Sequence, residues 1–436
     1  MKTYKLVNGP LNYPLICISM IVLLILGRDT LIANHILGFA ESQVLAIVLL
    51  GVLGIVFLLN NKSEIRQIIT DQRVGVIIVA ALIYILPLLL KLDFQLMYLS
   101  VFLCVVFGVF MSYIISVKNA AKIFVSTMCA LTLYSVVATY LLKPLTVAGI
   151  LPVEVITNSA GMTYYNYGLA FVATIVGYLR NGSLFREPGV FCFFLLLAVY
   201  LSNEYVEYKN RKFGRIITTG ILSLGVITTF STAGMIELVL LLGVILAKDR
   251  VYRHKSFWIA TAVATTAALA LIIYIVVEKG SLYWELYSMC IKLFQPNHSL
   301  SARLASIVGN LKMIMKHFFV GDTVVNVMYS LGDNTASTLI LFAMCGVLGG
   351  LVNVLLWLVL LWRSKQGLLI SICLTIVMFM TFNTQNLTTN LFFWLFPTMA
   401  FCQWLCECPF NIGKRFSYIK KQLRLKKEND HENSGN

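Results

Sequence analysis

Two arginines and a glutamate stand directly before a strongly apolar run. The stretch RNGSLFREPGVFCFFLLLAVYL begins at Arg180, contains Arg186 and Glu187, and then continues without a charge to Leu201. Charges beside a bilayer are costly, so these side chains either anchor a helix end or form a site. Arginine forks pair bidentately with phosphate, and a carboxylate can accept a proton from a hydroxyl group. The combination suits an anionic substrate held at a membrane surface.

The same residues also have a simpler interpretation. Proline fits the first turn of a helix, and a carboxylate favours the positive end of the helix dipole, so Glu187 and Pro188 are good residues with which to begin a helix. Arg186 could anchor that helix end at the membrane interface. The sequence leaves both interpretations open.

The composition is that of a helical membrane protein. Of the 436 residues, 59% are hydrophobic and only 12% are charged, which excludes an ordinary soluble domain. Apolar runs of about 15–25 residues recur along the chain, the length that a spanning helix needs. The alternating pattern of a membrane β-barrel does not occur. The first apolar run lacks a small-residue cleavage site, so we interpret it as a retained span.

The sequence therefore predicts an all-α polytopic integral membrane protein with about twelve transmembrane helices. The predicted spans lie at about 11–27, 43–59, 74–90, 95–116, 123–142, 189–203, 214–230, 233–247, 257–277, 336–361, 368–383 and 391–405. On this topology about 24 of the 34 Lys and Arg residues fall on one side, which by the positive-inside rule puts both termini in the cytoplasm. Topology thus accounts for the net charge of +15, and we expect no nucleic-acid partner.

We expect one multi-span membrane domain over 1–408 and a basic cytoplasmic tail over 409–436. Two long loops, at about 143–188 and 278–335, fall on the outer face. The apolar stretch from Tyr167 to Tyr178 is only about 12 residues long, which is too short for a span. The sequence therefore predicts a short re-entrant or interfacial helix there.

The second long loop contains the pattern of an amphipathic helix. Ser299 or Ser301 is a suitable N-cap, and Gly321 is a suitable helix-ending residue. The apolar residues fill one arc of the helix surface: Leu304, Ile307, Val308, Leu311, Ile314, Met315, Phe318 and Phe319. The borders of this arc are polar, with Arg303, Asn310 and His317 along one edge and Lys312 and Lys316 near the other. The apolar face could rest on the membrane or on the spans.

Other unusual residues fall on the same predicted face. The hairpins FSTAG (230–234) and TFNTQNLTTN (381–390) lie there, and Glu237 follows a little further into a span. A carboxylate within a span usually faces a cavity or a partner. The chain has no phosphate-binding nucleotide loop, whereas a sugar on a polyprenyl pyrophosphate would supply both an activated bond and a lipid anchor. The scattered cysteines lack metal-ligand spacing, and we expect no metal and no other cofactor.

Three stretches resemble the Wzy-type O-antigen and capsular polysaccharide polymerases, which are relatives of the O-antigen ligases. RNGSLFREPGVFCFFLLLA is similar to the family's Arg-x-x-Gly-x-Phe-x-Glu-Pro-Gly run before a span. SARLASIVGNLKMIMKHFFVGD resembles its Arg-led helix, which ends near a Pro-Leu-x-Gly turn. LGDNTASTLILFAMCGVLGGL resembles its His-Asn or Asp-Asn step before a span with a Gly-rich middle. The likeness covers roughly residues 165–400.

The resemblance implies a glycosyltransferase with a multi-span fold of the GT-C kind. Such an enzyme joins undecaprenyl-pyrophosphate-linked oligosaccharide repeat units on the outer face of the bacterial cytoplasmic membrane. The implied partners are the lipid-linked oligosaccharide, a flippase and a chain-length regulator.

The chain departs from the family pattern in three places. Ala233 stands where the family hairpin often has an arginine, so no anion contact is expected from that position. Asp333-Asn334 replaces the His-Asn of the ligase branch, which favours a polymerase. The Pro-Leu turn is replaced by Phe319-Val320 before Gly321.

We accordingly assign expected roles to the candidate residues. Arg186 and Arg303, then Arg180, would bind the pyrophosphate and stabilise the charge of the leaving group. Either Glu187 or His317 would be the catalytic base or a sugar-orienting group. The remaining candidates would hold the acceptor glycan or the loop: Asp322, Asp333, Asn334, Glu237 and Asn310.

Two alternatives remain open. The first is a ligase that moves a finished glycan to another acceptor. The second, from a different class, is a flippase for lipid-linked oligosaccharides. Flippases usually line a central path with charges inside their spans, whereas Glu237 is nearly the only such charge here.

Overall fold

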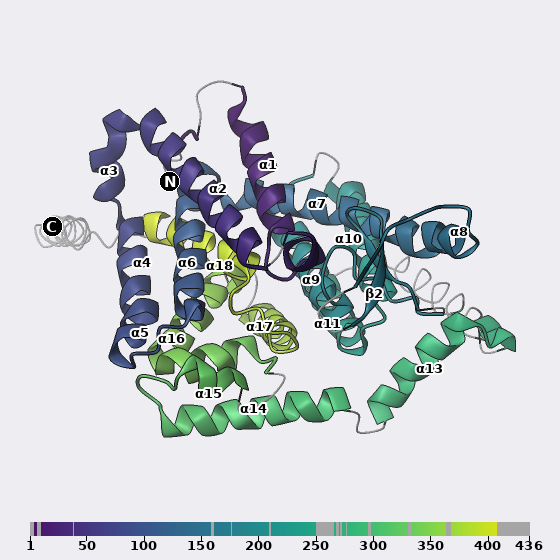
Figure 1. The fold of residues 1–436 in the computed structure, drawn as a ribbon. Coiled ribbons are helices and arrows are strands. Elements are labelled where there is room, and N and C mark those ends of the chain that lie inside the picture. Colours follow the sequence, from purple (N-terminus) through teal and green to yellow (C-terminus); the bar gives the residue numbers. More distant parts are fainter. Residues whose placement is uncertain are drawn as a thin grey trace, which may run out of the picture.

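The computed structural model describes residues 4–6, 10–37, 39–157, 161–175, 177–208, 211–249, 277–294, 298–329, 334–362 and 368–407, together with 266, 270 and 273–275. These residues form a bundle of helices with one small antiparallel sheet (Figure 1). Asp333, the tail over 409–436 and most of the predicted span at 257–277 lie outside the described residues.

Helices occupy the other predicted spans. The elements in these regions are α1 (Asn12–Ile25), α2 (Phe39–Asn60), α4 (Gln72–Ala80), η3 (Ala81–Ile85), α5 (Leu86–Leu90), α6 (Leu96–Ile114), α7 (Val117–Val137), η4 (Ala138–Leu142), α9 (Pro188–Glu204), α10 (Arg211–Thr228), α11 (Thr232–Lys248), α16 (Ser337–Trp362), α17 (Leu368–Phe382) and α18 (Leu391–Glu407). The loops add η1 (Ile32–Ile36), η2 (Lys62–Glu64), α3 (Ile65–Ile69), α8 (Lys143–Val147), α13 (Ser281–Phe294), α14 (His298–Lys316) and α15 (Val324–Tyr329). The amphipathic helix of the second long loop is thus confirmed as α14.

Among the described residues, four helices are long and apolar enough to cross a membrane: Gln72–Leu90, Leu96–Ile114, Val117–Val147 and Ser337–Trp362. A bent pair, Val44–Asn60 and Lys62–Ile69, gives a fifth candidate. Several further helices are apolar but shorter. A helical membrane protein fits these elements, and the count of twelve spans stays a prediction.

The expected short helix at Tyr167–Tyr178 is wrong, and the predominantly helical fold carries one small sheet. The first of the two predicted long loops forms a sheet of β1 (Val155–Thr157), β2 (Thr163–Asn166) and β3 (Phe171–Ala173), paired antiparallel in that order. Gly168 and Gly177 adopt left-handed φ angles of 82° and 80°, which interrupt a helix at both ends. A helix of this length is marginal alone, whereas the apolar residues of β3 gain a neighbouring strand.

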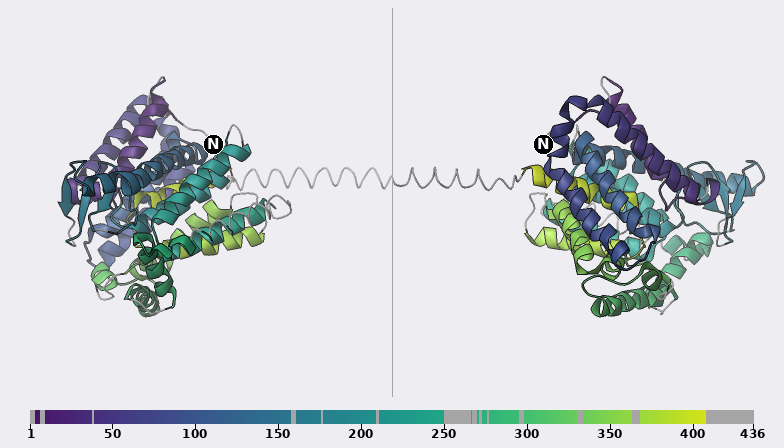
Figure 2. Two further views of the ribbon diagram at one scale, coloured as in Figure 1. Left: turned by 90° about the vertical axis from the view of Figure 1, so that its right-hand side faces the viewer. Right: turned by 60° about the vertical axis from the view of Figure 1, so that its left-hand side comes forward.

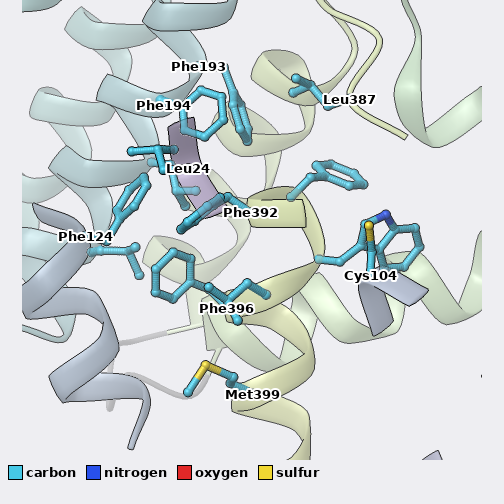
Figure 3. Close-up of a cluster of buried hydrophobic side chains, with 14 of the residues drawn as sticks. Leu24, Cys104, Phe124, Phe193, Phe194, Leu387, Phe392, Phe396 and Met399 are labelled. Atoms are coloured by element: carbon cyan, nitrogen blue, oxygen red, sulfur yellow. The ribbon is translucent and has the colours of Figure 1, made fainter. Parts of the chain in front are cut away.

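The core lies between α6, α7, α9 and α18 and is rich in phenylalanine (Figure 3). Phe124 of α7 stacks on Phe392 of α18, with ring centroids 5.4 Å apart. Phe194 of α9 stacks on Phe185 at 4.4 Å. Residues 190–202 of α9 are all buried, as expected for an apolar helix surrounded by others. The Arg180–Glu187 segment therefore leads into the central helix of the bundle.

Two stretches of backbone cross where α16 is broken. Gly346 inside α16 has a left-handed φ of 68°, and Gly321, just after α14, has a φ of 78°. A Cβ atom on Gly321 would collide with the carbonyl of Met344, and one on Gly346 would collide with the carbonyl of Phe319. Only glycine fits such an approach without strain.

Donors from other elements satisfy the carbonyls around this break. The N–H of Asp322 donates to the carbonyl of Ala343 (2.7 Å). Lys91, which follows α5, donates from Nζ to the carbonyls of Met344 and Asp322. Because an unpaired carbonyl in apolar surroundings costs several kcal/mol, these bonds fasten the end of α14 to α5 and α16.

We expect Gly321→Ala to destabilise the protein by about 1–2 kcal/mol from its left-handed φ alone, and by more because of the collision with Met344. The matched control is Gly54→Ala, since Gly54 lies in α2 with open space around its Cβ position and alanine favours a helix. Thermal unfolding in detergent micelles measures both. Equal midpoints for the two variants would contradict the crossing.

Candidate functional site

Buried hydrogen bonds fix the loop before α9. The side-chain nitrogen of Asn181 donates to the hydroxyls of Ser135 on α7 (2.9 Å) and Thr228 of α10 (3.2 Å). Its side-chain oxygen accepts from the N–H of Ser183 (2.9 Å), whose φ is left-handed at 52°. Such a conformation costs about 1–3 kcal/mol and persists only where the surroundings hold it. The loop is therefore firmly shaped by its neighbours.

The same loop runs beside the chain that follows α1. Thr30 and Phe185 form an antiparallel bridge, and the N–H of Arg186 donates to the carbonyl of Asp29 (2.9 Å). The side chains of these two residues also pair, with Arg186 Nε 3.1 Å from Asp29 Oδ1. Asn390, at the start of α18, donates to Asp29 Oδ2 (2.7 Å). One buried carboxylate thus joins three distant segments of the chain.

Arg186 presents its terminal nitrogens at the surface. Asp29 occupies the Nε edge of the guanidinium, while 38% of the Arg186 side chain is exposed. Arg186 Nη1 lies 3.9 Å from Glu187 Oε1, which is too long for a hydrogen bond. Glu187 is 54% exposed and occupies the N-cap position of α9 before Pro188, as predicted, without a side-chain capping bond. A solvent-accessible carboxylate therefore stands beside a solvent-accessible guanidinium.

Arg180 is held at the other end of the loop. Its Nε donates to the carbonyl of Thr229 (3.2 Å), and its side chain also hydrogen bonds with that of Tyr178. Lys143 is buried, and its Nζ donates to the carbonyls of Ile175 (2.9 Å) and Tyr178 (2.7 Å). A buried lysine thus fixes the segment that carries Arg180.

Glu237 is only 3% exposed in the second turn of α11. The hydroxyl of Ser231 caps this helix by accepting from the N–H of Gly234 (3.3 Å). The Glu237 carboxyl hydrogen bonds with the side chain of Thr381 and lies within electrostatic range of Arg303 on α14. A carboxyl group buried among apolar side chains needs such partners. Glu237 therefore links α11, α17 and α14.

Cys192 lies near the start of α9, where the helix meets α11. Its thiol is within electrostatic range of both Glu237 and Arg180. Gly234 comes so close to Cys192 Sγ that a side chain there would collide, which lets the start of α11 pack against α9. Arg180 and Glu237 therefore both lie close to the start of α9, and Arg303 in turn lies within electrostatic range of Glu237.

His317 lies apart from this region. Its Nε2 is 3.6 Å from Asp322 Oδ2. At about 1.5 Å per residue, the helix separates His317 from Arg303 by about 20 Å. Of the two expected bases, only Glu187 stands beside an arginine of the loop before α9.

Asn310 and Asn334 form a buried amide pair. Asn310 Nδ2 donates to Asn334 Oδ1 (2.8 Å), and Asn334 Nδ2 donates back to Asn310 Oδ1 (3.1 Å). Ser306 donates to Asn334 Oδ1 (2.7 Å), and Asn334 also donates to the carbonyl of Val327 (2.8 Å). These bonds fasten α14 to the chain around α15. Of the two expected roles of Asn310 and Asn334, holding the loop therefore fits these bonds better than holding the acceptor sugar.

The sequence interpretation missed several residues of the region. Arg28 and Asp29 follow the first predicted span on the outer face, so the same sidedness argument could have included them. Arg28 donates to the hydroxyl of Thr389 in the last hairpin. Glu285 of α13 accepts from the N–H of Leu179 (3.3 Å), and no local pattern in the sequence indicates that long-range contact.

The arrangement can bind a polyanion and move a proton, since guanidinium groups from different elements meet carboxyl groups near the start of α9. Among the residues that the structure describes, no three His, Cys, Asp or Glu side chains group together as metal ligands. Comparisons with models of protein families, with curated proteins and with solved structures find no match to this chain.

We expect Arg186→Ala to lower the free energy of unfolding by about 1–3 kcal/mol, because the buried Asp29 carboxylate loses its counter-charge. Adding Asp29→Asn should recover part of this loss, since a neutral amide costs less to bury. Thermal unfolding in detergent micelles compares the single and double variants. A double variant less stable than Arg186→Ala would contradict the proposed pairing.

The Asp322 carboxyl predicts a dependence of stability on pH. Burial opposes its ionisation, but hydrogen bonds from Asn326 and the N–H of Thr323, with His317 and Lys316 nearby, hold its pKa below the ordinary value. A depressed folded-state pKa contributes stability above the unfolded-state value of about 3.9, and the contribution is lost as the pH falls through the folded-state pKa. Asp322→Asn should therefore be less stable than the parent at pH 7 and approach it near pH 3. A difference that stays constant over this range would contradict the assignment.

Proposed function

We propose that this chain is a polysaccharide polymerase of the bacterial cytoplasmic membrane. It would join undecaprenyl-pyrophosphate-linked oligosaccharide repeat units on the outer face, with both termini in the cytoplasm. A flippase would supply its substrate, and a chain-length regulator would act with it. The GT-C kind of architecture, with about twelve spans, is part of this proposal.

The observation that carries the proposal is the gathering of arginines around the start of α9. Arg186 is anchored by a buried carboxylate through Nε alone, so its terminal nitrogens remain suited to a phosphate fork. Arg180 is oriented by the carbonyl of Thr229. Arg303 comes from the second outer loop and lies within electrostatic range of Glu237. Preorganised cations of this kind stabilise a pyrophosphate leaving group.

In the proposed reaction the acceptor sugar hydroxyl attacks the anomeric carbon of the growing glycan. The hydroxyl proton passes to Glu187, the new glycosidic bond forms, and the bond from the anomeric carbon to the pyrophosphate oxygen breaks. Arg186, Arg303 and Arg180 take up the negative charge that develops on the leaving lipid pyrophosphate. Glu187 is favoured as the base because it is exposed and adjacent to Arg186, whereas His317 pairs with Asp322.

The test is the glycan made by a strain that lacks this protein and carries a plasmid-borne variant. Arg186→Lys keeps the charge but loses the fork, and we expect it and Arg303→Ala to reduce polymer by about 10²–10³-fold. Glu187→Gln should reduce polymer by about 10²–10⁴-fold. Single lipid-linked repeat units should accumulate in each case. The matched control is Arg66→Ala, since Arg66 is an exposed arginine outside the region and its loss should leave polymer unchanged.

Normal polymer in all three variants, at normal protein levels, would overturn the proposal. Two other outcomes in the strain without the protein would replace it. Finished polymer still attached to its lipid carrier would indicate a ligase. Repeat units confined to the cytoplasmic face would indicate a flippase.

A further inference from the structure

One face of α14 is apolar and turned away from the rest of the protein. Leu304, Val308, Leu311 and Met315 follow one another at helical spacing, and between 45% and 75% of each side chain is exposed. Phe318 and Phe319, directly after the helix, extend the same apolar surface and are also exposed. We name Leu304, Val308, Leu311 and Met315 the α14 stripe. A contiguous exposed apolar stripe of this kind marks a surface that a membrane or another molecule covers.

The helix cannot bury the stripe by rotating. Its opposite side carries Ser306 and Asn310, which are both fully buried and bonded to Asn334. Turning the stripe inward would break these bonds and leave buried amide groups without partners, at a cost of about 1–3 kcal/mol for each. The outward direction of the stripe is therefore built into the fold.

The course of α14 is that of a helix lying in a membrane surface. It runs along the lower edge of the molecule, crosswise to α4 and α6 (Figure 1), packs against α16, and keeps to that edge in the two further views (Figure 2). Its C-terminal end is fastened next to a candidate span, since Lys91 follows Gln72–Leu90 and donates to the carbonyl of Asp322 (2.9 Å). An amphipathic helix fastened at the end of a span meets the boundary between headgroups and acyl chains.

Charge decides between lipid and protein as the occupant. Lys312 and Lys316 are exposed, and each follows a residue of the stripe by one position, about 100° around the helix. Lysines beside an apolar face extend to anionic headgroups while their carbon chains stay on the apolar surface. A second copy packed antiparallel on the same stripe would bring lysines against lysines, which is unfavourable.

We propose that α14 is an in-plane membrane anchor that binds the anionic phospholipid of the outer leaflet. The α14 stripe enters the acyl-chain boundary, and Lys312 and Lys316 contact phosphate groups. The choice of the outer leaflet rests on the topology of the proposed function, whereas the membrane contact itself concerns a lipid surface and none of the arginines assigned to the substrate.

The test uses the full chain in proteoliposomes, with a photo-crosslinking amino acid at Met315 or, as a control, at Glu154, an exposed residue of the other outer loop. We expect phospholipid adducts from Met315, detected by mass spectrometry, and none from Glu154. Replacing phosphatidylcholine partly by phosphatidylglycerol should raise the adduct yield. Lys312→Gln and Lys316→Gln should each reduce this gain about fivefold, and both changes leave the Asn310–Asn334 pair intact.

Three results would overturn the anchor. Chain-to-chain adducts from Met315 in place of lipid adducts would indicate a second copy on the stripe. Equal yields of lipid adducts from Met315 and Glu154 would mean that the α14 stripe lies no deeper in the membrane than Glu154. A yield independent of phosphatidylglycerol and of both lysines would remove the anionic headgroup from the proposal.

Discussion

The position of α14 depends on the place where Gly321 and Gly346 let two backbones cross. Each residue lacks a side chain where the other stretch passes, and the break in α16 leaves carbonyl groups that need donors. Lys91 and the N–H of Asp322 supply them. Because a buried carbonyl without a donor is costly, these bonds stabilise the crossing. It fastens one end of α14, and the Asn310–Asn334 pair fastens its middle.

The loop that carries Arg180 and Arg186 is held in the same way, because buried polar groups fix its irregular backbone. Asp29 joins the chain after α1 to Arg186 and to Asn390, and Lys143 holds the carbonyls before Arg180. Asp29 pairs with Arg186 and the carbonyls before Arg180 bind Lys143, so the surface-facing parts of the arginines are preorganised. The proposed chemistry and the proposed membrane contact meet in α14, which carries both Arg303 and the α14 stripe.

The positions of the helices follow from the sequence, because apolar runs of span length have few other ways to satisfy their backbone. The stretch 167–178 is an exception to this reasoning. It is apolar but short, and the pairing of β3 with β2 decides its form. The amphipathic pattern correctly predicts the helix α14. The pattern alone does not tell which side of the helix packs on the protein, and in the structure the polar side with Ser306 and Asn310 packs there. Long-range pairs such as Asp29 with Arg186 depend on the tertiary fold, which no local spacing reveals.

The Asn310–Asn334 pair fixes the rotation of α14 about its own axis. Arg303 stands about two turns before Asn310, so the two share nearly the same direction around the axis. Inserting a single residue between Arg303 and Ser306 would turn Arg303 by about 100° and carry it about 1.5 Å further from the pair, although every bond of Asn310 and Asn334 could still form. The identity of Ala305, an exposed residue of this interval outside the α14 stripe, can therefore vary among functional descendants of this chain, whereas the number of residues in the interval cannot.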